Sequence, residues 1–136
     1  MRQPAMLLAF STLGACASPL PPVDQKQAWV DLYTTTPGKV LMADRLDGKR
    51  LNDGRYCQVP PGKHELVVRF DYEINTGIFT TDPTERTCYL TLEYDGFQAG
   101  QRYRLEARAI AAQPNVWLYD AGRQVLAQER LTHCIP

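Results

Sequence analysis

Residues 64–72 read HELVVRFDY, a run in which apolar and polar side chains alternate. One face of this run, if extended, carries the apolar side chains of Leu66, Val68, Phe70 and Tyr72. The other face carries mostly charged residues, among them Glu65, Arg69 and Asp71. Because successive side chains of a β-strand point to opposite faces, this period of two predicts a strand with one face in a hydrophobic core.

The same alternation recurs on both sides of this run and predicts an all-β domain. The expected strands cover residues 28–34, 39–46, 55–59, 64–72, 86–94, 101–110, 116–120 and 124–128. Turn sequences separate them, including Thr36-Pro-Gly38, Asp47-Gly48, Asp53-Gly54 and Pro60-Pro-Gly62. Seven to eight short strands with regular turn signals are typical of an antiparallel β-sandwich, and we expect that fold over residues 28–136.

Residues 101–110 are the one segment where two signals disagree. Their Arg, Leu, Glu and Ala content suits a helix. Apolar and charged positions nevertheless alternate strictly from Arg102 to Ala109. Since hydrophobic periodicity is the stronger signal, we predict a strand, followed by a hairpin that turns at Ala121-Gly-Arg123.

Residues 1–15 have the pattern of a secretory signal peptide: Arg2, then the apolar run from Ala5 to Phe10, then small residues. The run is far shorter than the ~18 apolar residues that a transmembrane helix needs. Leu13-Gly-Ala-Cys16 resembles the bacterial lipobox, which implies that Cys16 becomes a lipidated N-terminus. Several acyl chains together anchor a protein firmly, and Ala17, where aspartate would retain it at the inner membrane, favours the outer membrane. A disulfide-forming Cys16 in a terminal tail is the alternative.

Residues 16–27 join the lipidation site to the domain. Their proline content, centred on Ser18-Pro-Leu-Pro-Pro22, favours an extended polyproline conformation and disfavours helix or strand. A free tether of this kind would span about 30 Å at ~3.1 Å per residue. The whole chain carries 15 basic and 15 acidic residues, and a nucleic-acid partner is excluded because phosphate binding needs clustered positive charge.

Three elements in this order are similar to a known group of proteins. They are the lipobox, Val-Pro-Pro-Gly-Lys-His-Glu-Leu at 59–66 and Ala-Gly-Gln-Arg-Tyr-Arg-Leu-Glu-Ala at 99–107. The chain resembles, over nearly its whole length, small envelope lipoproteins of pseudomonads and related Gram-negative bacteria. The Pro-Pro-Gly segment also resembles turns in PEGA-like and immunoglobulin-like envelope β-domains. The resemblance implies a fold and a location, and it brings no catalytic residue with it.

Cys57, Cys88 and Cys134 remain once Cys16 is lipidated, and an oxidising periplasm favours one disulfide among them. Cys57 lies mid-strand on the side of Val59, as a small buried hydrophobic residue would. Cys88 begins a strand and Cys134 follows the last expected strand. We therefore predict a Cys88–Cys134 disulfide that fixes the C-terminus, with a pairing that involves Cys57 as the open alternative.

Other polar residues give weaker signals of chemistry. A Cys57–His64 dyad would be misaligned across a hairpin, and a cysteine beside apolar neighbours has a raised pKa and is inert. His133 beside Cys134 lacks the spacing of a metal site. Asp44, Asp47 and Asp53 lack the ligand pattern of a calcium loop and suit turns instead. We expect no catalytic residue, no metal and no cofactor.

Two stretches are candidate contact surfaces. Arg102, Arg104 and Arg108 share the polar face of one strand and either meet an anionic partner or pair with acids such as Glu93 or Asp95. The loop at 73–83 is long for a hairpin and carries Ile78 and Phe79. These two residues either dock a partner or fold over the end of the core.

These observations predict a non-enzymatic lipoprotein, anchored in the outer membrane with its domain in the periplasm. The expected partners are the membrane, through the anchor, and another envelope protein. The alternative is a binding module for peptidoglycan, lipopolysaccharide or another anionic ligand, which would use the arginine row and exposed tyrosines.

Overall fold

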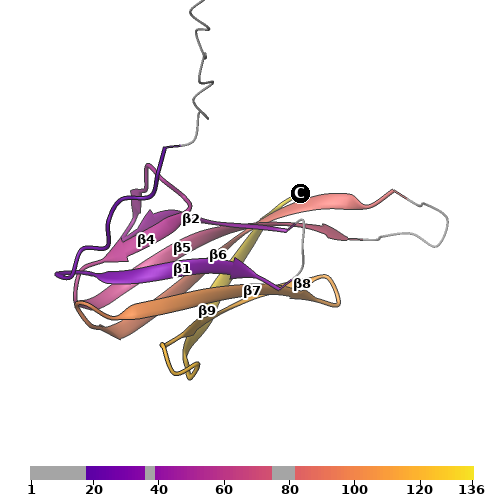
Figure 1. Cartoon of the computed structure of the whole chain (residues 1–136). Helices are drawn as coiled ribbons and strands as arrows, with labels where there is room; N and C mark the ends of the chain where they lie inside the picture. The colour runs from indigo at the N-terminus through magenta and orange to yellow at the C-terminus, as the bar shows by residue number, and fades with distance from the viewer. Residues whose placement is uncertain (1–17, 36–38, 75–81) are drawn as a thin grey trace, which may run out of the picture.

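The computed structural model describes residues 18–35, 39–74 and 82–136. Within these ranges the protein is all-β and contains no helix, so the all-β part of the expected fold is confirmed (Figure 1). Correspondingly, the described part of the chain contains no helix long and apolar enough to span a membrane. The nine strands are β1 (Ala28–Thr34), β2 (Val40–Leu46), β3 (Lys49–Arg50), β4 (Tyr56–Val59), β5 (Gly62–Ile74), β6 (Thr84–Phe97), β7 (Arg102–Ile110), β8 (Gln113–Tyr119) and β9 (Val125–Ile135).

The described strands form one nine-stranded sheet in the order β3-β2-β5-β6-β9-β8-β7-β1-β4. Its neighbours are antiparallel except β1 and β7, which run parallel, so the sheet is mixed. The sheet curls, and β9 joins its two halves because Val125–Gln128 pair with β8 whereas Glu129–Ile135 pair with β6 (Figure 1). The expected antiparallel sandwich of seven to eight strands is therefore not confirmed.

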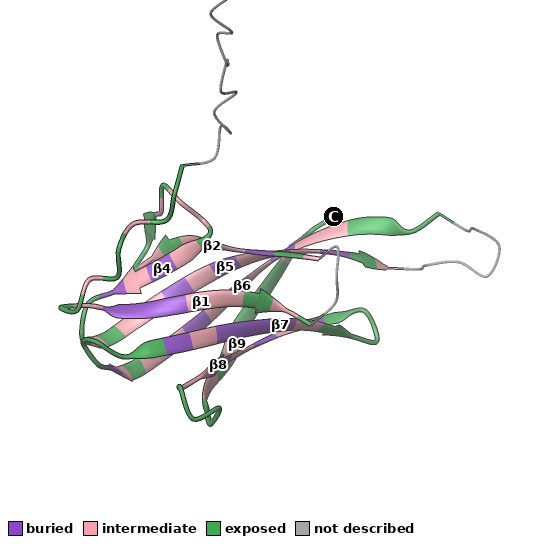
Figure 2. Ribbon diagram, in the orientation of Figure 1, coloured by how far each residue is buried: buried purple, intermediate pink, exposed green. Residues whose placement is uncertain are grey.

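The core lies between the two halves of the curled sheet (Figure 2). Leu66, Val68, Phe70 and Tyr72 of HELVVRFDY all face it, each with 1% of its surface exposed. They meet apolar rows from β6, β7 and β8, represented by Leu90, Leu105 and Leu118. Because each such side chain contributes about 1.5–3 kcal/mol on full burial, the alternating pattern decides which face of each strand turns inward.

The Pro60-Pro-Gly62 segment connects two distant parts of the sheet and is not a hairpin. β4 pairs only with β1, at one end of the sheet, while β5 pairs with β2 and β6. Gly62 has a φ of 108°, which residues other than glycine rarely adopt. This backbone conformation lets the chain change direction there. The expected β4–β5 hairpin was wrong because each of these strands has its partners elsewhere.

Two further differences concern strand length. β9 continues to Ile135, so Cys134 lies inside the last strand and not beyond it. β3 is an additional two-residue strand that pairs with the end of β2. The expected strand at 101–110 and the hairpin at residues 121–123 are confirmed, because β7 is extended and Tyr119 pairs with Val125.

Candidate functional site

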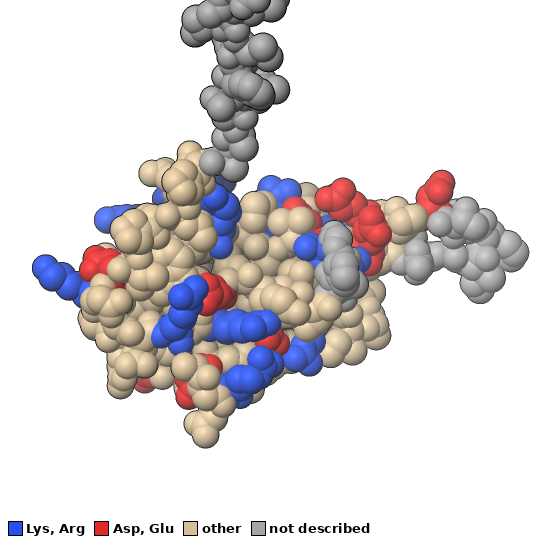
Figure 3. Space-filling view, in the orientation of Figure 1, with Lys and Arg blue, Asp and Glu red and all other residues tan. Residues whose placement is uncertain are grey.

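The outer face of β1, β7 and β8 gathers arginines and aromatic rings. Its arginines are Arg102, Arg104 and Arg108 of β7 together with Arg123 of the β8–β9 turn. Its rings are Trp29 and Tyr33 of β1 and Trp117 and Tyr119 of β8. Its acids are Asp31 and Glu106. We call these ten residues the Arg–aromatic face, and Figure 3 shows basic side chains gathered over β1 and β7.

Strand register brings these residues together. Parallel pairing sets Trp29 beside Arg102 and Tyr33 beside Glu106, while antiparallel pairing sets Trp117 beside Glu106 and Tyr119 beside Arg104. The polar positions of β7 point outward because the alternating positions, Tyr103, Leu105 and Ala107, are buried in the core.

Each guanidinium group lies over an aromatic ring. The Cζ atom of Arg104 is 3.8 Å from the centroid of the Tyr33 ring. The corresponding distance is 5.3 Å from Arg108 to Trp117. It is 5.8 Å from Arg102 to Trp29 and 6.0 Å from Arg123 to Tyr119. Cation–π attraction at such distances holds the flexible arginines in fixed positions.

Glu106 is the buried charge of this face, with 2% of its surface exposed. Arg104 Nε lies 2.9 Å from Oε1 of Glu106, and the terminal nitrogens of Arg108 and Arg123 lie 3.4 Å from its two oxygens. The Nε atoms of Arg104 and Arg108 are buried without a hydrogen bond of good geometry among the described residues. Three cations thus share one carboxylate, which leaves positive charge and N–H donors in excess.

The Asp31 end of the face is more fully paired. Arg102 donates two hydrogen bonds to Asp31, at 2.7 and 3.0 Å, and the Trp29 indole donates a third at 2.9 Å. The Arg102 bonds lower the pKa of Asp31 most, against a smaller opposing effect of burial. Trp29 is also stacked on Tyr56, with ring centroids 4.7 Å apart. The excess of donors therefore lies at the Glu106 end.

The acids expected to pair with the arginine row are not the ones that do. Glu93 pairs with Lys63 and Arg130, on the other half of the sheet. The partners of the row, Asp31 and Glu106, and the fourth cation, Arg123, were missed. Alternation alone placed Glu106 in the row, and no sequence signal placed β1 parallel to β7. Cys16, Ile78 and Phe79 lie outside the described residues.

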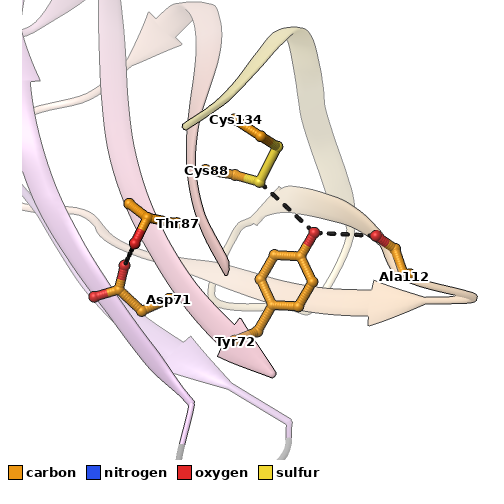
Figure 4. Close-up of a disulfide and its surroundings, with 6 residues drawn as sticks. All are labelled: Asp71, Tyr72, Thr87, Cys88, Ala112 and Cys134. Atoms are coloured by element: carbon orange, nitrogen blue, oxygen red, sulfur yellow. Dashed lines mark hydrogen bonds between the residues drawn. A yellow bond between two sulfur atoms is a disulfide. The ribbon is translucent and has the colours of Figure 1, made fainter. Parts of the chain in front are cut away.

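The predicted disulfide between Cys88 and Cys134 is confirmed (Figure 4). The two cysteines lie directly opposite each other on β6 and β9. Tyr72 packs beside them: its hydroxyl lies 3.6 Å from Cys88 Sγ and donates a hydrogen bond of 3.0 Å to the carbonyl of Ala112. The disulfide therefore ties β9 to β6 beside the core residue Tyr72.

Cys57 and His64 have different neighbours, and no hydrogen bond joins them within the described ranges. Cys57 is a free, buried thiol, and burial raises its pKa to about 12. His64 Nδ1 lies 2.6 Å from Oδ2 of Asp47, whose other oxygen accepts the Glu65 N–H. These hydrogen bonds, that of Glu65 first, lower the pKa of Asp47. Both groups therefore have local roles in packing and in a turn.

The acidic turn residues are likewise engaged locally. Asp44 lies 3.5 Å from Arg45, and Asp53 accepts three hydrogen bonds from the guanidinium group of Arg55. In the described ranges, no three His, Cys, Asp or Glu side chains are grouped so that they could hold a metal ion.

Comparisons with protein-family models, with curated proteins and with solved structures found no match to this chain. The functional argument therefore rests on the Arg–aromatic face and on the N-terminal sequence.

Proposed function

We propose that this protein is a lipid-anchored envelope protein whose β-domain binds another envelope protein and catalyses no reaction. The Arg–aromatic face carries the proposal, as the surface on which the partner docks. In this proposal the two halves of the curled sheet serve as the layers of a sandwich, and the face lies on the outside of one layer.

The composition of the face supports a protein interface. Arginine, tryptophan and tyrosine are the residues that most often dominate binding energy at such interfaces. Tyr33 keeps 45% of its surface exposed, so a large ring is available for contact. Because Glu106 and the rings already hold the guanidinium groups, these arginines would lose less side-chain entropy when a partner binds them.

Charge defines the chemistry of the partner. Four arginines against Asp31 and Glu106 give the face a formal charge of +2. On a protein partner, arginine makes its strong charge-assisted hydrogen bonds with carboxylates, which accept two parallel N–H groups. The partner is therefore a protein with exposed Asp or Glu side chains beside apolar surface.

Cross-linking in cells tests this proposal. The native protein is cross-linked and its adducts are identified by mass spectrometry, alongside a Tyr33→Ala/Arg104→Ala variant. Loss of hot-spot contacts worth ~2 kcal/mol or more lowers partner occupancy about 30-fold. The matched control is Arg69→Ala/Tyr89→Ala on the other outer face, which keeps the adduct. A dominant adduct that survives the first variant as well as the control would contradict this assignment of the contact surface.

An anionic glycan is the second candidate, because sugar rings pack on exposed aromatic rings while arginines bind acidic groups. It predicts no dominant protein adduct, together with retention on isolated peptidoglycan or lipopolysaccharide. That retention should fall as salt is raised, since the charges involved are exposed to solvent. Specific attachment through the Arg–aromatic face should be lost in the Tyr33→Ala/Arg104→Ala variant and kept in the Arg69→Ala/Tyr89→Ala control. Non-specific attachment should not distinguish the two variants.

The lipid anchor is tested separately. We expect the mature protein to begin at Cys16 and to carry acyl chains, which intact-mass measurement of membrane extracts detects. Cys16→Ser should abolish both the mass increase and the membrane attachment. A mature chain that begins elsewhere, without lipid, would remove the anchor from the proposal and leave the binding face untouched.

A further inference from the structure

The segment that leads into the domain is held against it at both ends. At its start, the carbonyl of Ser18 accepts a 2.8 Å hydrogen bond from Arg55, and that guanidinium is itself fixed by Asp53. At its end, the carbonyl of Gln27 accepts a hydrogen bond of 3.0 Å from the N–H of Gly100. Residues 18–27 therefore run along the domain and leave it beside Arg55.

This point of attachment sets the distance to the lipid. Only Ala17 lies between Ser18 and Cys16, and these two residue steps span at most about 7 Å. A free proline-rich tether over residues 18–27 would instead allow about 30 Å. On the proposed function, in which Cys16 is lipidated, the Arg55 end of the domain thus lies within side-chain reach of the lipid headgroups.

That end of the domain is basic. β2 and β3 form a short hairpin in which Arg45 lies directly opposite Arg50, and Leu46 opposite Lys49. Like charges in directly opposed positions are unfavourable unless something neutralises them. Lys49 and Arg50 are both exposed, and neither has an ion pair within the described part of the chain.

We propose that the β2–β3 hairpin, with Arg45, Lys49 and Arg50, lies on the surface of the anchoring membrane and binds anionic phospholipid headgroups. Lipid phosphates would supply the negative charge that Lys49 and Arg50 lack within the described part of the chain, and they would add to that of Asp44 beside Arg45. The three acids nearby are engaged elsewhere: Asp47 accepts the Glu65 N–H and lies 2.6 Å from His64 of β5, Asp53 accepts hydrogen bonds from Arg55, and Asp44 lies 3.5 Å from Arg45. Within the described part of the chain, none of them forms an ion pair with Lys49 or Arg50.

Docking in this way orients the whole domain. The described chain begins at Ser18, which Arg55 holds just before β4, whereas the Arg–aromatic face lies along β1, β7 and β8 (Figure 1). The hairpin would therefore rest on the membrane while the Arg–aromatic face stays on the side of the domain, open to a partner in the periplasm.

Fluorescence quenching on the full, lipidated protein tests the orientation. Single fluorophores are attached at Asn52→Cys, near the hairpin, or at Gly122→Cys, in the β8–β9 turn. The protein is placed in vesicles of phosphatidylethanolamine and phosphatidylglycerol that contain a headgroup quencher. Cys57 is buried and stays unlabelled. We expect strong quenching at position 52 and little at position 122, whereas equal quenching would overturn the inference.

A double charge-reversal variant tests whether the basic side chains of the hairpin cause this orientation. Each basic side chain at an anionic surface strengthens attachment about fivefold, so Lys49→Glu/Arg50→Glu should lower the ratio of docked to undocked domain at least tenfold. Lys39→Glu/Arg86→Glu, at the opposite end of β2 and β6, changes the charge equally and should leave the ratio unchanged. The unmutated protein in phosphatidylcholine alone should lose docking as the reversal does. Quenching at position 52 that is insensitive to both the reversal and the lipid would contradict binding of anionic headgroups.

The measurement also separates this inference from the proposed function. A protein that carries no acyl chain by mass removes the anchor from the proposed function and overturns the membrane docking with it, while the Arg–aromatic face as a binding surface is untouched. A lipidated protein whose domain shows no preferred orientation overturns the membrane docking alone.

Discussion

Glu106 is the side chain of the Arg–aromatic face that we expect to contribute most to stability. It is buried, and its charge holds Arg104, Arg108 and Arg123 together. Glu106→Gln keeps the shape but leaves three cations without a counter-charge, and we expect a loss of about 2 kcal/mol in the free energy of unfolding. The loss stays below that of a fully buried pair because the arginines are partly exposed. Urea denaturation measures it.

The matched control for this substitution is Glu93→Gln. Glu93 also pairs with two cations, Lys63 and Arg130, but these groups are solvated and should contribute little to stability. An equal shift of the urea midpoint in both variants would show that burial does not distinguish Glu106.

Cys57 should make stability fall at alkaline pH. Its pKa is raised from 9.0 to about 12 by burial, so above pH 9.0 the unfolded chain loses a thiol proton that the folded chain keeps. The unfolded state is therefore favoured as pH rises, by about 1.4 kcal/mol per pH unit until the pKa in the folded state is reached. The difference in urea midpoint between the native protein and Cys57→Ala should change with pH above 9 and stay constant below it. A constant difference throughout would contradict a buried neutral thiol.

For single residues, the sequence predicts which side chains are buried in the core, but it does not predict every role. Period-two alternation places Cys57 in the core, and it would have done so in any sheet topology. The role of Glu106 could not be predicted, because Tyr33, one of the two residues beside it, comes from β1, a strand that is remote in sequence.

Among the strands, β9 depends most on the disulfide. From Glu129 to Ile135 this strand pairs only with β6, and its side chains are mostly exposed. The disulfide closes a loop of 46 residues, which stabilises the folded state by about 4 kcal/mol in the chain-entropy model. Reduction should lower the urea midpoint accordingly and speed amide hydrogen exchange at residues 131–135. Unchanged exchange there after complete reduction would show that backbone pairing alone holds the strand.

The strands themselves could largely be predicted, and their partners could not. Alternation identified β5 and β7 because burial of one face is a local property of the sequence. The end of β9 was missed because, with little of it buried, its sequence alternates weakly. The partners of β4 were wrong because Pro60-Pro-Gly62 matches a turn, and a turn sequence does not specify whether the next strand pairs with the preceding one.

For the whole molecule, the parallel pairing of β1 and β7 is the feature that sequence reasoning could not supply. About seventy residues separate Trp29 from Arg102, which lies beside it. Antiparallel strands joined by short turns are the simplest interpretation of regular turn signals, and nothing local indicates a parallel neighbour. The same pairing places Trp29, Asp31 and Tyr33 beside the arginine row that the sequence did predict. The topology and this part of the Arg–aromatic face therefore escaped prediction for one reason.

A single core predicts that the two halves of the sheet unfold together. Leu90 on β6 and Leu118 on β8 are both fully buried in one hydrophobic cluster, while both tryptophans, Trp29 and Trp117, lie on the β1–β7–β8 half. Leu90→Ala should cost ~2–5 kcal/mol, because a deleted core side chain leaves a cavity. Although it lies on the other half, it should lower the urea midpoint of tryptophan fluorescence as much as that of far-ultraviolet circular dichroism. Leu118→Ala, on the tryptophan half, is the matched substitution and should give the same coincidence. If Leu90→Ala lowered the circular dichroism midpoint alone, the halves would be separate folding units, and the Arg–aromatic face would belong to only one of them.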